Sequence, residues 1–146
     1  MSLVLCATRG GKESIIAQDK AIALAKEQGA PLVFLYIADS SFLNKSAAAV
    51  IVDVDEELTE MGEFFLLMAV ERADQEGVKA KAEVRSGVFR EILPNVALEL
   101  EASTIVLGHP AGETSHFQEA EFEAYLKTLA QETGATVLTP EKEARE

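Results

Sequence analysis

The sequence predicts an α/β fold, with a single five-stranded parallel sheet of strand order 3-2-1-4-5 and helices on both faces. Three observations support this prediction. Short apolar segments alternate with longer amphipathic segments along the chain, which is typical of parallel strands joined by helices. The first, second and fourth strand segments are the most apolar, which places them inside the sheet. The third is half polar and the fifth is short, which places them at the edges.

The first two strands and the helix between them are well marked. The segments Leu3–Ala7 and Leu32–Ile37 are apolar throughout, as expected of central strands covered on both faces. Between them, residues Ser14–Gln28 form an amphipathic helix that Gly29 and Pro31 end.

Residues 42–55 are the hardest to interpret, because an alanine run and three β-branched residues follow one another. The segment fits a lid over the crevice beyond the carboxyl ends of the strands, a short extra element or a region without fixed structure. Asp55 fits a helix N-cap, and the helix is expected to continue to about Glu76. Its inward face is predicted to be Leu58, Met61, Phe65, Met68 and Ala69, and we expect Phe64, Leu67 and Val70 to widen this face within the core rather than to meet another subunit.

The second half of the chain supplies three more strands. Residues Lys79–Arg85 alternate charged and small side chains, which predicts an edge strand with one wet face. A helix is expected from Val88 to about Glu101, with a kink or a distinct first turn at Pro94. The remaining elements are a strand at Thr104–Leu107, a helix from His116 to about Thr133 with Phe117, Phe122, Leu126, Leu129 and Ala130 inward, and a last strand at Thr136–Thr139.

Composition limits the classes of function. The 146 residues suit one domain, expected over residues 1–140, followed by a charged tail at 141–146. The formal net charge of −12 disfavours nucleic acid and anionic lipid as partners. No apolar run is long enough to cross a membrane, so we expect a cytoplasmic protein. The single cysteine, Cys6, lies in an apolar strand and is expected to be buried and inert.

The segment from Gly108 to Gly112 has a sequence pattern typical of a ligand-binding loop. It follows a buried strand, and Ser115 with Gln118 resembles a capping box that opens the next helix. In the predicted strand order this loop lies beside the loop Thr8–Lys12, at the point where the winding direction reverses. Two interpretations remain open, a phosphate site and a loop whose glycines only allow the chain to turn.

The catalytic motifs tested do not match. A phosphate-binding loop around Gly11-Lys12 would need glycine where Cys6 stands and Ser or Thr where Glu13 stands, and the dinucleotide fingerprint lacks its glycine spacing. A receiver domain would need acids at Ala7-Thr8. No nucleophile elbow occurs, and the metal-ligand spacing fails for the group His109, Glu113, His116 and Glu119. We therefore expect that the protein is not an enzyme.

Taken together, residues 2–139 resemble the universal stress protein family. The resemblance lies in Gly10-Gly11 with Glu13-Ser14, in Val33–Asp39, in Arg85-Ser86-Gly87 before Glu91-Ile92-Leu93, and in Thr104–His109. It implies the same Rossmann-like five-stranded sheet, a dimer commonly formed through the last strand, and a role in stress survival that is not plainly catalytic.

Nucleotide-binding members of that family resemble one another in a loop of Gly, two residues, Gly, nine residues, then Gly and Ser or Thr. Here Gly108 matches, Gly112 comes one residue late, and Phe122-Glu123 stand where Gly-Ser belongs. The acid usual at the end of the first strand is replaced by Thr8 or Arg9. The sequence is thus similar to the branch that does not hold ATP, although Arg9, Lys12 and Arg85 are cations able to attract an anion.

Two hypotheses follow. The first is a cytoplasmic homodimer that acts by interaction in the stress response and lacks tight ATP binding, with Thr136, Val137, Leu138 and Thr139 pairing across a two-fold axis. The alternative is a sensor that binds AMP or ATP where strands one and four diverge. Backbone groups of Ala7 and Ile37 would meet the base, and those from Gly108 to Ser115 the phosphate. The candidate binding residues are Ala7, Thr8, Arg9, Ile37, Gly108, His109, Gly112, Thr114 and Ser115.

Overall fold

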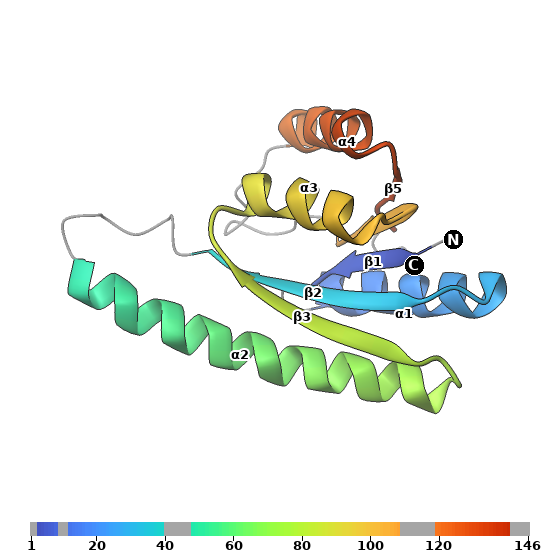
Figure 1. Cartoon of the computed structure of the whole chain (residues 1–146), viewed down its shortest axis with the longest axis horizontal. Coiled ribbons are helices and arrows are strands. Elements are labelled where there is room, and N and C mark those ends of the chain that lie inside the picture. Colours follow the sequence, from blue (N-terminus) through green and yellow to red (C-terminus); the bar gives the residue numbers. More distant parts are fainter. Residues whose placement is uncertain (1–2, 9–11, 40–47, 109–118, 141–146) are drawn as a thin grey trace.

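The computed structural model describes residues 3–8, 12–39, 48–108 and 119–140. Strands and helices alternate along this part of the chain (Figure 1). In order they are β1 (Val4–Ala7), α1 (Lys12–Gln28), β2 (Leu32–Ala38), α2 (Ala48–Gln75), β3 (Ala80–Ser86), α3 (Phe89–Leu100), β4 (Thr104–Leu107), α4 (Glu119–Thr133) and β5 (Thr136–Leu138).

The five strands form one sheet of order β3-β2-β1-β4-β5, and every neighbouring pair is parallel. This confirms the predicted fold class and strand order. The central strand β1 is buried at every position, and its residue Ala7 is in register with Leu35 of β2 and Leu107 of β4. β3, the predicted wet edge strand, is only partly buried. The most apolar strands therefore lie inside the sheet, as the sequence indicated.

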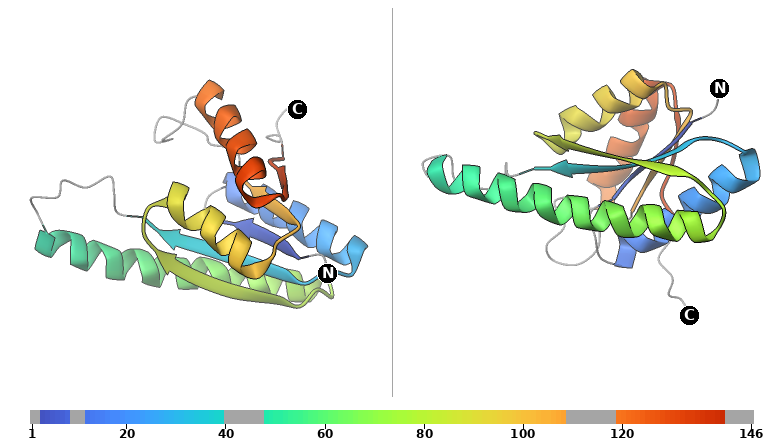
Figure 2. Two further views of the ribbon diagram at one scale, coloured as in Figure 1. Left: turned by 45° about the horizontal axis from the view of Figure 1, so that its top comes forward. Right: turned by 60° about the horizontal axis from the view of Figure 1, so that its bottom comes forward.

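Helices cover both faces of the sheet (Figure 2). On one face, α1 and α2 pack over alternate strand residues such as Cys6 and Phe34. On the other, α3 and α4 pack over the intervening residues, including Leu5 and Leu35. The single cysteine is fully buried, as predicted. Within the described residues, no helix is both long and apolar enough to cross a membrane.

The helix α2 differs from the prediction at its start. It begins at Ala48, so Asp55 lies inside the helix and the proposed N-cap there is wrong. Alanine has the highest helix propensity, and the alanines ahead of Val50 outweigh the β-branched residues that obscured the pattern. With 28 residues, α2 projects past the carboxyl end of β2 (Figure 1). Residues 42–47 lie outside the described part.

The inward face of α2 is also narrower than predicted. Leu66, Ala69 and Ala73 are buried and Phe65 is half-buried, but Met61 and Met68 are 48% and 50% exposed. The predicted widening of this face within the core is confirmed for Val70, which is half-buried against the core, but is wrong for Phe64 and Leu67, whose exposed fractions are 59% and 65%. Among the α2 side chains that the structure describes, the large exposed apolar ones are Met61, Phe64, Leu67 and Met68. Gly62 lies so close to the ring of Tyr36 that a Cβ atom there would overlap it, so the buried arc of α2 is narrow and rich in small residues.

The helices on the other face agree better with the sequence. α3 contains Pro94 in its interior, where the residue is buried. In α4, Phe122 and Leu129 are buried and Leu126 and Ala130 are half-buried, as expected, whereas Phe117 lies outside the described residues. The division into a domain at 1–140 and a tail at 141–146 stays a prediction.

Candidate ligand site at the carboxyl edge of the sheet

The winding of the chain reverses between β1 and β4. Helix α1, which follows β1, covers one face of the sheet, and α4, which follows β4, covers the other. Since Ala7 is in register with Leu107, the next residues, Thr8 and Gly108, leave the sheet side by side. Ligands of open parallel sheets bind at such a reversal, beyond the carboxyl ends of the strands.

Two of the predicted site residues have buried side chains, so they offer a ligand only their backbone. Ala7 and Ile37 are 5% and 7% exposed, and their side chains pack with Leu107 into the core beneath α3 and α4. Gly108 is half-exposed at the end of β4. The other predicted residues, Arg9, His109, Gly112, Thr114 and Ser115, lie outside the described residues, as do the capping partner Gln118 and the other members of the rejected metal group except Glu119.

The hydroxyl of Thr8 is held on the α1 side of the sheet. Its Oγ1 accepts a hydrogen bond of 2.6 Å from Nε2 of Gln18, and both residues are buried. The backbone N–H of Thr8 donates to the carbonyl oxygen of Leu35 at 2.8 Å. Two polar groups of this residue are therefore satisfied within the protein.

Gln18 continues this contact to the neighbouring helix. Its Oε1 accepts a hydrogen bond of 2.7 Å from Nη1 of Arg72 on α2, and Nη2 of Arg72 forms an ion pair with Asp19. Thr8, Gln18 and Arg72 thus link the end of the central strand to α2. This network could not be predicted from the sequence, because a glutamine ten residues from a threonine forms no local pattern.

A carboxylate lies at the start of α3. Oδ2 of Asp39, the residue after β2, accepts a hydrogen bond of 2.8 Å from the backbone N–H of Phe89, the first residue of α3. Gly87 N–H donates to the carbonyl oxygen of Ala38 at 3.1 Å and brings the two segments together. Free N–H groups at a helix start attract anions, and here the protein supplies its own anion. Asp39 falls within the segment Val33–Asp39 that carries the family resemblance, but no local pattern in the sequence indicates its contact with α3.

The guanidinium of Arg85 is paired within the protein. Its two terminal nitrogens lie 3.1 and 3.0 Å from the two carboxylate oxygens of Glu99 on α3, and Nη2 lies 3.3 Å from Glu83. The bond to Glu99 raises the pKa of Arg85, and the same bond lowers the pKa of Glu99. The charge of this cation is therefore largely neutralised before any external anion arrives.

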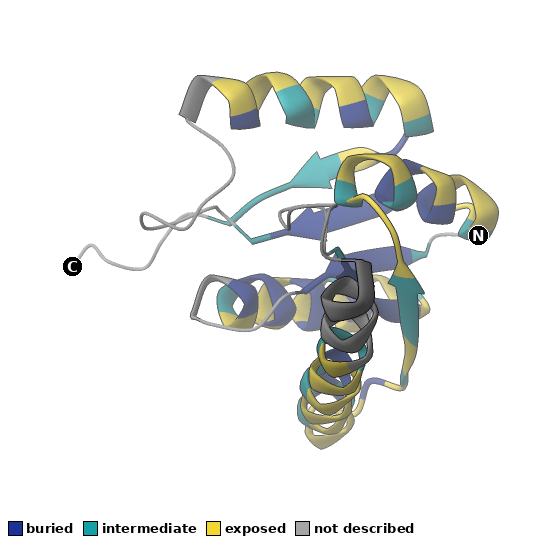
Figure 3. Cartoon of the chain, turned by 90° about the vertical axis from the view of Figure 1, so that its left-hand side faces the viewer, coloured by how far each residue is buried: buried dark blue, intermediate teal, exposed yellow. Residues whose placement is uncertain are grey.

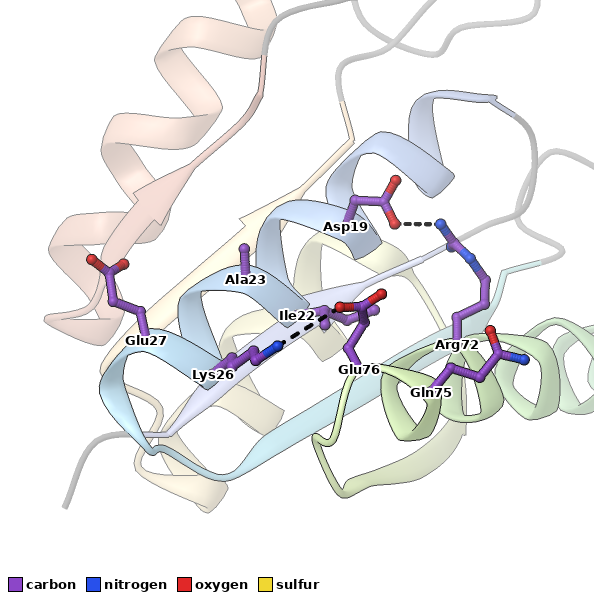
Figure 4. Close-up of a pocket in the computed structure, with 8 residues that line it drawn as sticks. All are labelled: Asp19, Ile22, Ala23, Lys26, Glu27, Arg72, Gln75 and Glu76. Carbon is purple, nitrogen blue, oxygen red and sulfur yellow. Dashed lines mark hydrogen bonds and ion pairs between the residues drawn. The ribbon is translucent and has the colours of Figure 1, made fainter.

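A separate hollow of about 570 Å³ lies between α1 and α2 (Figure 4). The ion pair between Arg72 and Asp19 spans one end, and Lys26 and Glu76, 3.8 Å apart, span the other. It is lined by the second half of α1 and the last turns of α2, toward the amino ends of the strands. The hollow is thus distinct from the candidate site at the carboxyl edge of the sheet. The described residues contain no group of three or more side chains suited to holding a metal ion.

Known proteins resemble this chain in family and in fold. A model of the universal stress protein family matches residues 1–120. A crystal structure from the same family, from Burkholderia pseudomallei, is 25% identical, covers 95% of each chain and has a TM-score of 0.68. The universal stress protein UspA from Lactobacillus plantarum is 15% identical over 96% of this chain and 97% of its own, with a TM-score of 0.77.

A third similar structure contains a nucleotide. It is a universal stress protein family protein from Arabidopsis thaliana with AMP bound, 13% identical, with a TM-score of 0.62 over 99% of this chain and 94% of its own. At this identity the likeness shows the fold alone. The comparison with curated proteins gave no match.

Proposed function

Because the chain belongs to the universal stress protein family, we propose that it serves the stress response as a non-catalytic homodimer that acts by interaction and does not bind ATP tightly. The observation that carries this proposal is the position of Thr8. Where nucleotide-binding relatives are expected to present an acid, this chain has Thr8 or Arg9, and the hydroxyl of Thr8 is bonded to Gln18 on the α1 side. That hydroxyl is therefore already engaged on the face of the sheet that α1 covers.

The start of α4 supports the same proposal. Phe122 stands where the phosphate loop of nucleotide-binding relatives is expected to have its last glycine, and it is 4% exposed inside α4. A phenylalanine side chain at this position crowds the place where the N–H of a glycine would meet phosphate. The next residue, Glu123, is exposed and would repel phosphate.

The homodimer is proposed to form through β5. This strand lies at the edge of the described sheet, with Thr136 exposed and Val137 and Leu138 half-buried. Oγ1 of Thr139 donates a hydrogen bond of 3.0 Å to the carbonyl oxygen of Leu107, which fixes the residue after the strand. Pairing Thr136–Thr139 across a two-fold axis would cover an open edge. Light scattering at micromolar concentration should give the mass of a dimer, and the mass of a monomer would contradict this part of the proposal.

The second candidate function is an AMP or ATP sensor. It is favoured by the neighbouring exits of Thr8 and Gly108, and by the AMP in the Arabidopsis relative of the same fold. The backbone of Ala7 and Ile37 would then meet the base, and the segment from Gly108 to Ser115, with Arg9 nearby, would meet the phosphate. A cytoplasmic location and the exclusion of nucleic acid as a partner stay predictions from composition.

One titration decides between the two functions. Protein checked to be free of carried-over nucleotide is titrated with magnesium ATP and with AMP in a calorimeter. The interaction protein gives no saturable heat with either ligand. The sensor binds about one nucleotide per subunit, and replacing Gly112 by valine abolishes that binding while Ala124→Val, at an exposed position of α4, preserves it.

A further inference from the structure

The outer side of α2 carries exposed apolar side chains. Met61, Phe64, Leu67 and Met68 are between 48% and 65% exposed, and we call them the α2 patch. Their spacing of three and four residues puts them on one side of the helix. Exposed positions run along the side of α2 that faces away from the sheet (Figure 3). Large apolar side chains gathered on a surface mark a site of interaction more often than chance exposure does.

Hollows lie beside the patch, between α2 and the edge strand β3. One of about 440 Å³ is bordered by Leu67, Val70 and Val84, and another of about 400 Å³ by Leu67, Val70 and Val78. Leu67 and Val70 border both, so the two hollows are neighbours. Each is large enough to accept an apolar side chain from outside.

Exposed acidic residues surround the patch and the hollows. They are Glu57, Glu60, Glu63, Glu71 and Asp74 of α2. Lys79 is the single basic residue among those that line the two hollows in the described part of the chain. The surface is therefore apolar at its centre and negative at its margin.

This charge pattern indicates which class of partner can bind the α2 patch. A second copy of this chain in contact through the same face would place five carboxylates near five more, on subunits of formal net charge −12 each, and these charges would repel each other. An anionic membrane would be repelled by the same carboxylates. A partner with apolar side chains flanked by Lys and Arg satisfies both features. Methionine adds adaptability, because its unbranched side chain fits differently shaped partners.

We propose that the α2 patch docks a cationic amphipathic helix of a partner protein. Apolar side chains of that helix enter the hollows beside β3, and its basic side chains face Glu60, Glu63 and Glu71. The inference rests on the proposed function, in that it supplies the class of partner through which an interaction protein would act.

The probe is a labelled 14-residue peptide of leucine and lysine, with leucine at helical spacing so that one face is apolar. Fluorescence anisotropy at about 0.15 M salt, where exposed charges are screened beyond a Debye length, should show saturable micromolar binding. Two matched peptides serve as controls. One has the same composition in an order that destroys the apolar face, and the other has glutamate in place of lysine. Equal binding of the shuffled peptide would overturn the proposal, because charge alone would then explain the affinity.

Protein variants locate the binding surface. The double variant Phe64→Asp and Leu67→Asp should weaken binding at least about 10-fold, since both side chains are exposed and replacing them leaves the core intact. Leu98→Asp, at a 53% exposed position on α3, is the control and should bind as the wild type does. If the control variant weakened binding as much as the double variant, the assignment of the binding surface to α2 would be contradicted. It would also be contradicted if the wild type were a dimer and the double variant a monomer, because the α2 patch would then be the dimer interface.

Charge reversal gives an independent readout. Changing Glu60, Glu63 and Glu71 together to lysine should transfer preference from the lysine peptide to the glutamate peptide, and retained preference for lysine would overturn the proposal. The proposed function is judged separately, by nucleotide titration and by subunit mass. If the protein binds ATP tightly and still binds the peptide, the proposed function is contradicted but the docking surface is supported. If it binds neither ATP nor the peptide, only the docking surface is contradicted.

Discussion

Gly62 of α2 faces the ring of Tyr36 of β2. A Cβ atom added at Gly62 would lie 2.1 Å from Cδ2 of that ring and 2.5 Å from Cγ. Both are atoms of the rigid ring, which is packed in the core with 6% of the residue exposed. The contact sets the distance between α2 and the sheet, and therefore also which side of α2 remains outside.

The change Gly62→Ala should destabilise the protein, although alanine is by about 1 kcal/mol the better helix former. The added methyl group overlaps the Tyr36 ring, and overpacking of this kind costs about 1–3 kcal/mol. We expect a net loss in the free energy of unfolding, measured by urea denaturation. Combining it with Tyr36→Ala should make the added methyl group favourable, because the ring is then gone. A stabilising effect of Gly62→Ala alone would show that the helix can move outward at little cost.

The fold was predictable because its signals are local. Buried parallel strands need continuous apolar segments, and Leu32–Ile37 shows one, so strand positions and order follow from burial alone. The apolar positions of α2 did not show which of them are buried. That depends on the close approach of Gly62 to Tyr36, a contact between residues 26 positions apart in the sequence.

Of the candidate site, only the reversal of the sheet between β1 and β4 could be predicted from the sequence. Gly108 and Thr8 mark the reversal in the sheet, but the partners that decide their chemistry are distant in the sequence. Asp39 meets the N–H of Phe89 across 50 residues, and Arg85 meets Glu99 on a different element. Such pairs depend on the packing of whole elements, and the local sequence around one residue of a pair does not indicate which residue is its partner.

The hydrogen bond between Thr8 and Gln18 should be measurable in stability. Replacing Thr8 by valine keeps the shape of the side chain but removes the acceptor for a buried amide N–H, which costs about 1–3 kcal/mol. The double variant with Gln18→Leu should lose less than the sum of the two single variants, because the unsatisfied donor is removed too. Thr128→Val, at an exposed position of α4, is the matched control and should change the free energy of unfolding little. Additive losses would mean that the two side chains do not depend on each other.

Alkaline pH should destabilise the protein through Tyr125. Burial raises the pKa of Tyr125 to about 12, from an ordinary value of 10.0. The folded state thus favours the neutral phenol, and this stabilisation is complete below pH 10 and is lost as the pH rises toward 12. Between pH 9 and pH 11 the free energy of unfolding of the wild type should fall by about 1 kcal/mol more than that of Tyr125→Phe. Equal falls in chemical denaturation at the two pH values would contradict the raised pKa.

A single substitution at the end of α3 should stabilise the protein. Glu101 has φ 57° and ψ 46°, the left-handed conformation, and its N–H donates to the carbonyl oxygen of Leu98 at 3.2 Å. A side chain with a Cβ is disfavoured in this conformation by about 1–2 kcal/mol. The change Glu101→Gly relieves that cost but gives the unfolded chain more freedom, so we expect a net gain of about 0.5–1 kcal/mol in the free energy of unfolding. The same change at Glu71, an exposed interior position of α2, should instead cost about 1 kcal/mol. Urea denaturation of both variants separates the two effects, and a loss at both positions would show that the left-handed turn after α3 carries no strain.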